Sequence, residues 1–161
     1  PTPALASSSL SLTSESRDCI LVAEDTAICQ TLLTRLLEKL DCQVDVVANG
    51  SEAVEAYRKR QYAAILMDIQ MPTMGGFEAT MHIRQHEQTV GSHVPIIAIT
   101  AHTQPGDRER CLTAGMDEYL PKPVTLEMLK RALKQRLPRL SVSTNVSTIT
   151  GTGSAVLVEK V

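Results

Sequence analysis

Aromatic residues are scarce in this sequence: among its 161 residues there is no Trp, one Phe and three Tyr. So few rings leave little surface on which a nucleic-acid base or a flavin can stack. The formal net charge of -2 gives no electrostatic support for a nucleic-acid surface either. The composition therefore predicts that the protein has no nucleic-acid partner.

Cysteine is sparse as well, and its spacing argues against a zinc site or a disulfide framework. Cys19, Cys29, Cys42 and Cys111 form neither a CxxC pair nor a Cys/His pattern, so we expect buried or half-buried thiols. No apolar run reaches the length of a membrane span, and the chain does not open with a basic segment followed by an apolar one. We expect a cytoplasmic domain that makes no membrane contact.

Both ends of the chain differ in composition from its middle. Residues 1–17 are mostly Ser, Thr, Ala and Pro, and residues 139–161 are rich in Ser, Thr and Gly. Such segments bury too little apolar surface to offset the entropy lost on ordering, so they are interpreted as linkers. In the second segment, VSTIT, GTG and SAVLV also have the outline of a short hairpin. The remaining residues, 18–138, are predicted to form one globular domain.

Short apolar runs alternate with helical patterns along this middle part. Continuous runs such as CILVA, AAILM and PIIAIT are typical of strands covered on both faces, as in a parallel sheet. The predicted strands are residues 19–23, 44–48, 63–67, 95–100 and 118–120, and the predicted helices are residues 28–40, 50–58, 77–86, 107–114 and 126–137. Five strands alternating with five helices predict a doubly wound α/β fold with a parallel sheet.

The first predicted helix carries an apolar stripe. The stripe consists of Ile28, Leu32, Leu33, Leu36, Leu37 and Leu40. This spacing is typical of a helix that packs against a core.

Polar residues follow the predicted strands at the points where they end. Glu24 and Asp25 follow the first, Asp68 the third, Thr100 ends the fourth and Lys122 follows the fifth. In a doubly wound sheet these side chains converge on one edge. Three carboxylates there repel one another, and a hard divalent cation such as Mg²⁺ removes that cost. A cation, an ammonium, a hydroxyl and a carboxylate nucleophile together predict a phosphoryl-group site.

Each of these residues also has an ordinary structural explanation. An acidic pair favours a helix N-terminus. Asp68 can form an Asx-turn, Thr100 can bond to nearby backbone, and Lys122 can be a solvated charge. Any single residue is best explained in that way. Their appearance in this order at successive strand ends favours the common site.

Five stretches of the sequence together cover almost the whole of residues 18–137. They are ILVAEDT, NGSEAVEAY, ILMDIQMPTMGGFEAT, PIIAITAHT and GDRERCLTAGMDEYLPKP. In them the chain resembles the receiver domain of two-component response regulators, and in particular the receivers of hybrid sensor histidine kinases. The resemblance implies the flavodoxin-like strand order 2-1-3-4-5. It also implies a piece of a larger phosphorelay protein, without an output domain of its own.

The resemblance assigns the chemistry to Asp68, which would accept a phosphoryl group from a phosphohistidine. Glu24, Asp25, Asp68 and the backbone carbonyl of Gln70 would hold Mg²⁺ or Mn²⁺. The implied partner is a histidine kinase or a histidine phosphotransfer domain. The isolated domain would support only its own phosphotransfer and autodephosphorylation, and the parent protein would be a histidine kinase.

Further roles follow from the same resemblance. Thr100 and Lys122 would bind the phosphoryl oxygens, and Tyr119 would reorient together with Thr100. The bond between Lys122 and Pro123 is usually cis in this family. Two side chains, Gln70 and His102, would control the lifetime of the phosphoryl group. Gln70 can orient a water with its amide, and His102 can bond that water or obstruct it.

The sequence departs from the family at two places next to the site. Thr26 stands where Asn is common after the acidic pair, and Gly75 stands where the family more often has Asp. Neither residue takes part in the chemistry directly, so we expect these two departures to affect partner recognition and loop rigidity instead.

Three alternatives use similar features. A phosphatase with an Asp nucleophile, like haloacid-dehalogenase-like enzymes, needs a second Asp two residues later, where this chain has Gln70. A phosphorylation-independent interaction module on the same fold has no need for the acidic pair, Asp68, Thr100 and Lys122. A flavodoxin-like electron carrier needs a hydroxyl-rich phosphate loop after the first strand, whereas AEDTAIC is acidic there.

Overall fold

The computed structural model describes residues 17–101 and 103–137. Within them, strands and helices alternate as the hydrophobic pattern predicts. The strands are β1 (Cys19–Ala23), β2 (Gln43–Val47), β3 (Ala64–Asp68), β4 (Ile96–Thr100) and β5 (Glu118–Pro121). The helices are α1 (Ala27–Lys39), α2 (Gly50–Lys59), α3 (Gly76–Val90), α4 (Asp107–Thr113) and α5 (Leu126–Lys134).

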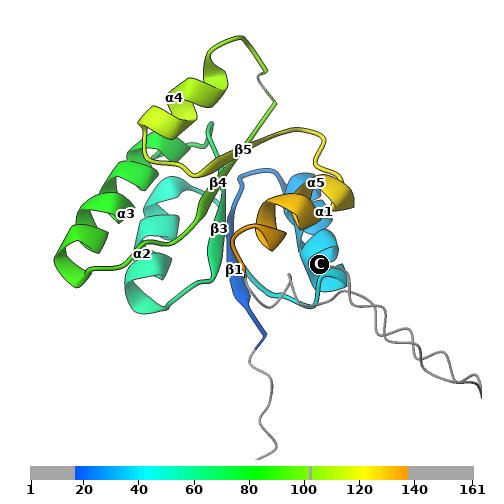
Figure 1. The fold of residues 1–161 in the computed structure, drawn as a ribbon, viewed down its shortest axis with the longest axis horizontal. Helices are drawn as coiled ribbons and strands as arrows, with labels where there is room; N and C mark the ends of the chain where they lie inside the picture. Colours follow the sequence, from blue (N-terminus) through cyan, green and yellow to red (C-terminus); the bar gives the residue numbers. More distant parts are fainter. Residues whose placement is uncertain (1–16, 102, 138–161) are drawn as a thin grey trace, which may run out of the picture.

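The five strands form one parallel sheet in the order β2-β1-β3-β4-β5. This confirms the doubly wound fold and its strand order. Because every strand runs in the same direction, each βα loop lies at the same edge of the sheet, beyond the carboxyl ends of the strands. Figure 1 shows the helices on both sides of the sheet.

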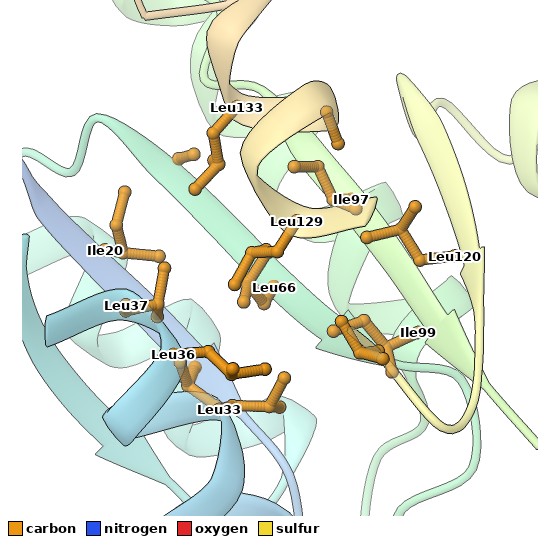
Figure 2. Packing of buried hydrophobic residues seen from close by; sticks show 14 of the residues in the cluster. Ile20, Leu33, Leu36, Leu37, Leu66, Ile97, Ile99, Leu120, Leu129 and Leu133 are labelled. Atoms are coloured by element: carbon orange, nitrogen blue, oxygen red, sulfur yellow. The ribbon is translucent and has the colours of Figure 1, made fainter. Parts of the chain in front are cut away.

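Two apolar cores cover the two faces of the sheet, because successive residues of a strand point in opposite directions. On one face, Ile20 and Val22 of β1 pack with the buried side of α1 and with α5 (Figure 2). On the other face, Leu21 and Ala23 pack with α2, α3 and Cys111 of α4. The central strands are therefore buried on both sides, which explains their uninterrupted apolar runs. All four cysteines are free thiols.

Only part of the predicted apolar stripe of α1 is buried. Leu33, Leu36 and Leu37 are in the core, whereas Ile28 is 80% exposed and Leu32 is 41% exposed. The interpretation of one continuous core-facing stripe was therefore wrong for its first two positions. The six apolar residues spread over about half of the helix circumference at 3.6 residues per turn, which is wider than the face one sheet can cover.

Helix α3 continues four residues past the predicted end at His86 and closes at Gly91, whose φ is 70°. The residues of this last turn are mostly polar, so the apolar periodicity of the sequence did not indicate that the helix continues. Glu87 is nevertheless buried, because its carboxylate accepts the Val94 N–H at 2.6 Å and a bond from Arg84 Nη1 at 2.7 Å. Side-chain contacts of Glu87 with Arg84 and with the loop that follows the helix thus accompany a last turn that has no apolar signal.

The described chain enters and leaves the fold at the edge opposite the βα loops. Arg17 precedes β1, and Leu137 follows α5, which runs back across the sheet toward the starts of the strands (Figure 1). The predicted linkers at 1–17 and 139–161, including the hairpin, lie outside the described residues apart from Arg17.

Candidate functional site

The polar residues predicted from the strand ends meet at the carboxyl edge of the sheet. Glu24 follows β1, Asp68 ends β3 and Thr100 ends β4, while Lys122 follows β5. Glu24 is 0% exposed, Asp68 is 6% exposed and Thr100 is buried. Buried polar side chains need partners, so this edge carries either a compensated cluster or a binding site.

Three carboxylates form the centre of this cluster. Glu24, Asp25 and Asp68 each offer an oxygen, and these oxygens all lie within 4.8 Å of one another. Asp25 is exposed, whereas its two neighbours are buried. Like charges at this separation are costly in a buried position. An all-oxygen donor set with one side open to solvent fits a hard cation such as Mg²⁺, which retains several waters.

Lys122 lies between two of the carboxylates. Its Nζ is 2.8 Å from Glu24 Oε2 and 3.1 Å from Asp68 Oδ2. Burial lowers the pKa of Lys122, but hydrogen bonds to Glu24 and Asp68 outweigh this effect and raise its pKa above the ordinary value. The ammonium therefore stays charged. The ion pair between Lys122 and Glu24 was not predicted from the sequence, because the order of the strands does not determine which side chains pair.

The loop after β3 fixes the Asp68 carboxylate. Its Oδ1 accepts the backbone N–H of Gln70 at 3.2 Å, so the Asx-type contact considered for Asp68 alone is present together with the Lys122 contact. Gly76 donates its N–H to Ile69 O at 2.9 Å, and a Cβ at Gly76 would collide with the carbonyl oxygen of Asp68. Only glycine permits this close approach of α3 to the end of β3.

An open cavity of about 430 Å³ lies beside Thr100. Its lining residues are Ile69, Gln70, Phe77, Thr100, Gln104, Asp107 and Arg110. The cavity lies between the end of β4 and the start of α4. The βα loops therefore leave space next to the cluster for a group that Thr100 can contact.

The remaining predicted site residues belong to β5, to the peptide bond after Lys122 and to the loop after β4. Tyr119 of β5 is half-buried against the core shared with α4, and its pKa is raised by burial and by the negative charge of Asp107. The bond between Lys122 and Pro123 is cis. His102 lies outside the described residues, so its predicted role stays a prediction.

A second groove, of about 270 Å³, opens on the α1 side of the cluster. It is mostly apolar, and it is lined by Cys29, Leu32, Leu33, Ile99, Lys122, Pro123 and Val124. Lys122 belongs both to this groove and to the carboxylate cluster. The exposed side chain of Ile28 comes from the first turn of the same helix. Apolar surface thus adjoins the charged site directly.

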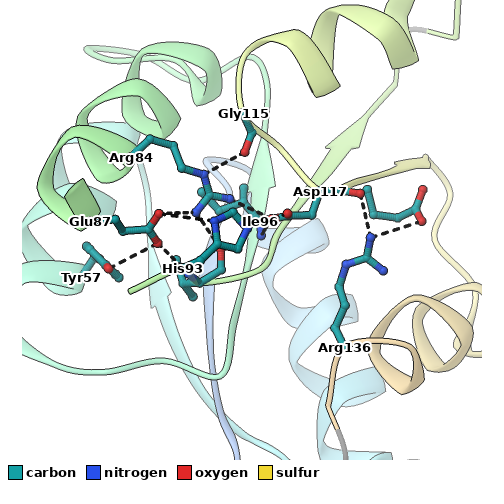
Figure 3. A network of polar contacts seen from close by, with 10 residues as sticks. Tyr57, Arg84, Glu87, His93, Ile96, Gly115, Asp117 and Arg136 are labelled. Atoms are coloured by element: carbon teal, nitrogen blue, oxygen red, sulfur yellow. Dashed lines mark hydrogen bonds and ion pairs between the residues drawn. The ribbon is translucent and has the colours of Figure 1, made fainter. Parts of the chain in front are cut away.

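A separate polar network lies at the opposite edge of the sheet, and Figure 3 shows that it centres on Arg84. The guanidinium of Arg84 contacts Glu87 Oε2 and Asp117 Oδ2, each at 2.7 Å, and Arg84 Nε donates to Gly115 O at 2.8 Å. The network joins α3 to the segment between α4 and β5. It is remote from the carboxylate cluster, so we interpret it as structural.

Comparison with known sequences identifies one family. The family described as "Response regulator receiver domain" matches residues 20–134. Hybrid signal transduction histidine kinase I of Dictyostelium discoideum is 39% identical over 123 residues, which cover 73% of this chain and 7% of the relative. Probable histidine kinase 1 of Oryza sativa subsp. indica is 38% identical over 74% of this chain and 15% of the relative. The chain therefore spans a small part of these curated relatives.

Solved structures give the same result. The receiver domain of sensor histidine kinase PA1611 from Pseudomonas aeruginosa PAO1, with a magnesium ion coordinated in its active-site cleft, is 42% identical at a TM-score of 0.69 and covers 75% of this chain and 98% of that chain. The receiver domain of Ssk1 from Saccharomyces cerevisiae, crystallised with the phosphotransfer protein Ypd1, belongs to an assembly matched at 31% identity and a TM-score of 0.70, over 74% of this chain and 88% of that chain. Among the helices described here, none is long and apolar enough to cross a membrane.

Proposed function

The chain belongs to the response regulator receiver domain family, and on that premise we propose that Asp68 is its phosphoacceptor. The donor is the phosphohistidine of a histidine kinase or of a histidine phosphotransfer protein. The observation that carries this proposal is the cluster itself, in which three carboxylate oxygens lie within 4.8 Å and Lys122 bonds to both Glu24 and Asp68. Because the relatives that share this region are histidine kinases, we propose a hybrid kinase as the parent protein.

The transfer step follows from the positions of these side chains. A carboxylate oxygen of Asp68 attacks the phosphorus, the bond from phosphorus to the imidazole nitrogen breaks, and an acyl phosphate forms. The Lys122 ammonium neutralises charge on the phosphoryl oxygens, and the Thr100 hydroxyl donates a hydrogen bond to them. Glu24, Asp25, Asp68 and the Gln70 carbonyl would hold Mg²⁺, or Mn²⁺ in its place, and the bound cation would offset the negative charge that gathers there. A phosphatase of the haloacid-dehalogenase type needs a second Asp two residues after its nucleophile, and this chain has Gln70 at that position.

The switch uses the space beside Thr100. Once a phosphoryl group draws the Thr100 hydroxyl toward Asp68, the cavity next to it is available to a ring. Tyr119 lies on the neighbouring strand and packs against α4. Its reorientation would carry the signal to the face formed by α4 and β5, a small displacement between two packed arrangements.

A direct test is phosphorylation by acetyl phosphate. We expect intact-mass spectrometry to show one added phosphoryl group in the presence of Mg²⁺ and none in the presence of EDTA, because the three carboxylates then repel the incoming anion. Proteolytic mapping should place the group on Asp68. Labelling that is independent of metal, or an adduct on Glu24 or Asp25, would contradict the proposal.

The apolar groove on the α1 side is proposed to dock the histidine donor. A donor imidazole must approach Asp68 closely, and this groove shares Lys122 with the cluster. Ile28 and Leu32 extend apolar surface from it into solvent. In the yeast assembly matched above, a receiver domain of the same fold is crystallised with a histidine phosphotransfer protein, which supports a protein occupant of that class.

Ile28→Asp should slow transfer from a phosphorylated histidine phosphotransfer protein that donates to the wild type. We expect about a tenfold loss, the effect of about 1.4 kcal/mol of lost docking energy. The rate with acetyl phosphate should not change, because Ile28 is 80% exposed and is not part of the carboxylate cluster. Val90→Asp, an exposed apolar position at the other end of the molecule, is the matched control. Equal effects of both substitutions would exclude this face as the docking surface.

A further inference from the structure

The loop that carries two of the three carboxylates leads into a helix that has no side-chain cap. Glu24 and Asp25 lie between β1 and α1, and Thr26 is the N-cap residue of α1. The Thr26 side chain makes no capping bond, and no acidic residue occupies the first turn. An uncapped helix start leaves backbone donors unsatisfied and allows the adjoining loop to fray. Other contacts must therefore hold the acidic pair in place.

Gln30 supplies one of these contacts from within α1. Its side-chain Nε2 donates to the backbone carbonyl of Glu24 at 2.6 Å, and its own N–H donates to Thr26 O at 2.9 Å. The Glu24 N–H donates to Val47 O at 3.0 Å, and Glu24 Oε1 accepts the Thr26 N–H at 3.1 Å. Gln30 thus binds the peptide group between the two acidic residues.

The orientation of that peptide group determines where Asp25 points. The Glu24 carbonyl and the Asp25 nitrogen lie in one planar unit, so fixing the oxygen restricts rotation about the bonds that lead to the Asp25 Cα. Glu24 itself is anchored by Val47 and Lys122. Asp25 is exposed, and its side chain makes no hydrogen bond or ion pair with residues 17–101 or 103–137, so its position depends most on the backbone. Without this restraint on the backbone, ordering Asp25 upon cation binding would cost more conformational entropy.

We infer that Gln30 is a positioning residue for the acidic pair and raises the affinity of the site for a divalent cation. It acts through the Glu24 carbonyl rather than by contact with the ion. The inference rests on the proposed function, because it assumes that Glu24, Asp25 and Asp68 form the cation site. It assigns a role to a side chain that no strand-end or motif argument selects.

Titration of Mg²⁺ into the purified protein, followed by isothermal calorimetry, tests this role without phosphotransfer. Gln30→Met keeps the length of the side chain and removes the donor. We expect the dissociation constant for Mg²⁺ to rise about tenfold, the lower end of the effect of residues that orient metal ligands. The phosphorylation rate with acetyl phosphate should fall at limiting Mg²⁺ and recover at saturating Mg²⁺, because Asp68 is unchanged.

Thr31→Ala is the matched control. Thr31 Oγ1 donates to Ala27 O at 3.0 Å, so its loss also removes a side-chain bond at the start of α1 but leaves the Glu24 carbonyl untouched. Its dissociation constant should equal that of the wild type. Equal constants for Gln30→Met and the wild type would overturn the inference alone, and so would equal increases in both variants. A wild type that binds no Mg²⁺ would overturn the proposed cation site as well.

Discussion

Asp68→Asn should yield a folded protein that no longer accepts a phosphoryl group. The amide keeps the shape of the side chain and can still accept the Gln70 N–H that Asp68 Oδ1 accepts at 3.2 Å. Lys122 loses its contact with a carboxylate at this position but keeps the one with Glu24 at 2.8 Å. An amide oxygen is a far weaker nucleophile than a carboxylate and forms no stable acyl phosphate. Intact-mass spectra after acetyl phosphate and Mg²⁺ should show no adduct.

Asp25→Asn is the informative comparison for this variant. Asp25 belongs to the same cluster but is exposed, and it stands on the loop rather than at the end of β3. We expect it to require more Mg²⁺ and to be phosphorylated more slowly, yet to carry the group on Asp68. The acceptor assignment fails if Asp68→Asn is labelled at the rate of the wild type while urea unfolding shows both proteins to be folded.

Arg84→Met should destabilise the fold strongly, because the Arg84 guanidinium is the centre of a largely buried polar network. The guanidinium contacts Glu87 and Asp117 and also donates to the carbonyls of Gly115 and Val94 at 2.8 Å (Figure 3). Glu87 is only 4% exposed, so removing Arg84 leaves a buried carboxylate without its cation. Breaking a buried pair in this way costs about 3–5 kcal/mol, a large share of the roughly 5–15 kcal/mol that stabilises a typical domain.

Two further variants separate this effect from a general loss of charge. Arg60→Met removes an ion pair with Asp45 at 3.0 Å, in which both side chains are at least 40% exposed, and should cost about 1 kcal/mol or less. Adding Glu87→Gln to Arg84→Met should recover part of the stability, since the buried charge is then gone. Urea unfolding at neutral pH gives each free energy. A cost for Arg84→Met no greater than that for Arg60→Met would show that the network contributes little.

The strands and the site could be predicted because burial and topology leave strong local signals. A strand covered on both faces, such as Ala64–Asp68, contains only apolar residues until its last position. The polar residue at that position then stands out. Parallel strands bring such positions to one edge, so the placement of Glu24, Asp68 and Lys122 at the same edge could be predicted, whereas the individual ion pairs of Lys122 could not.

Features that depend on a particular side-chain bond, or on how much of a helix the sheet covers, could not be predicted in this way. The last turn of α3 contains Glu87, which a periodicity argument places in solvent and the structure buries against Arg84. Ile28 has the apolar character of a core residue, yet it lies outside the part of the α1 circumference that the sheet covers. The bond from Gln30 to the Glu24 carbonyl leaves no composition or spacing signal at all.

The common edge at which the chain enters before β1 and leaves after α5 has a consequence for how the domain works within a longer protein. Arg17 and Leu137 both lie on the side away from Asp68, so neither point of attachment is at the edge where the proposed donor would arrive. In the proposed hybrid kinase, the segments that connect residues 17–137 to the rest of the chain would set the local concentration of the domain near its donor, and this concentration would change with segment length. Inserting or deleting residues outside 17–137 would then change the rate of the proposed intramolecular transfer, while the proposed chemistry at Asp68 stays the same.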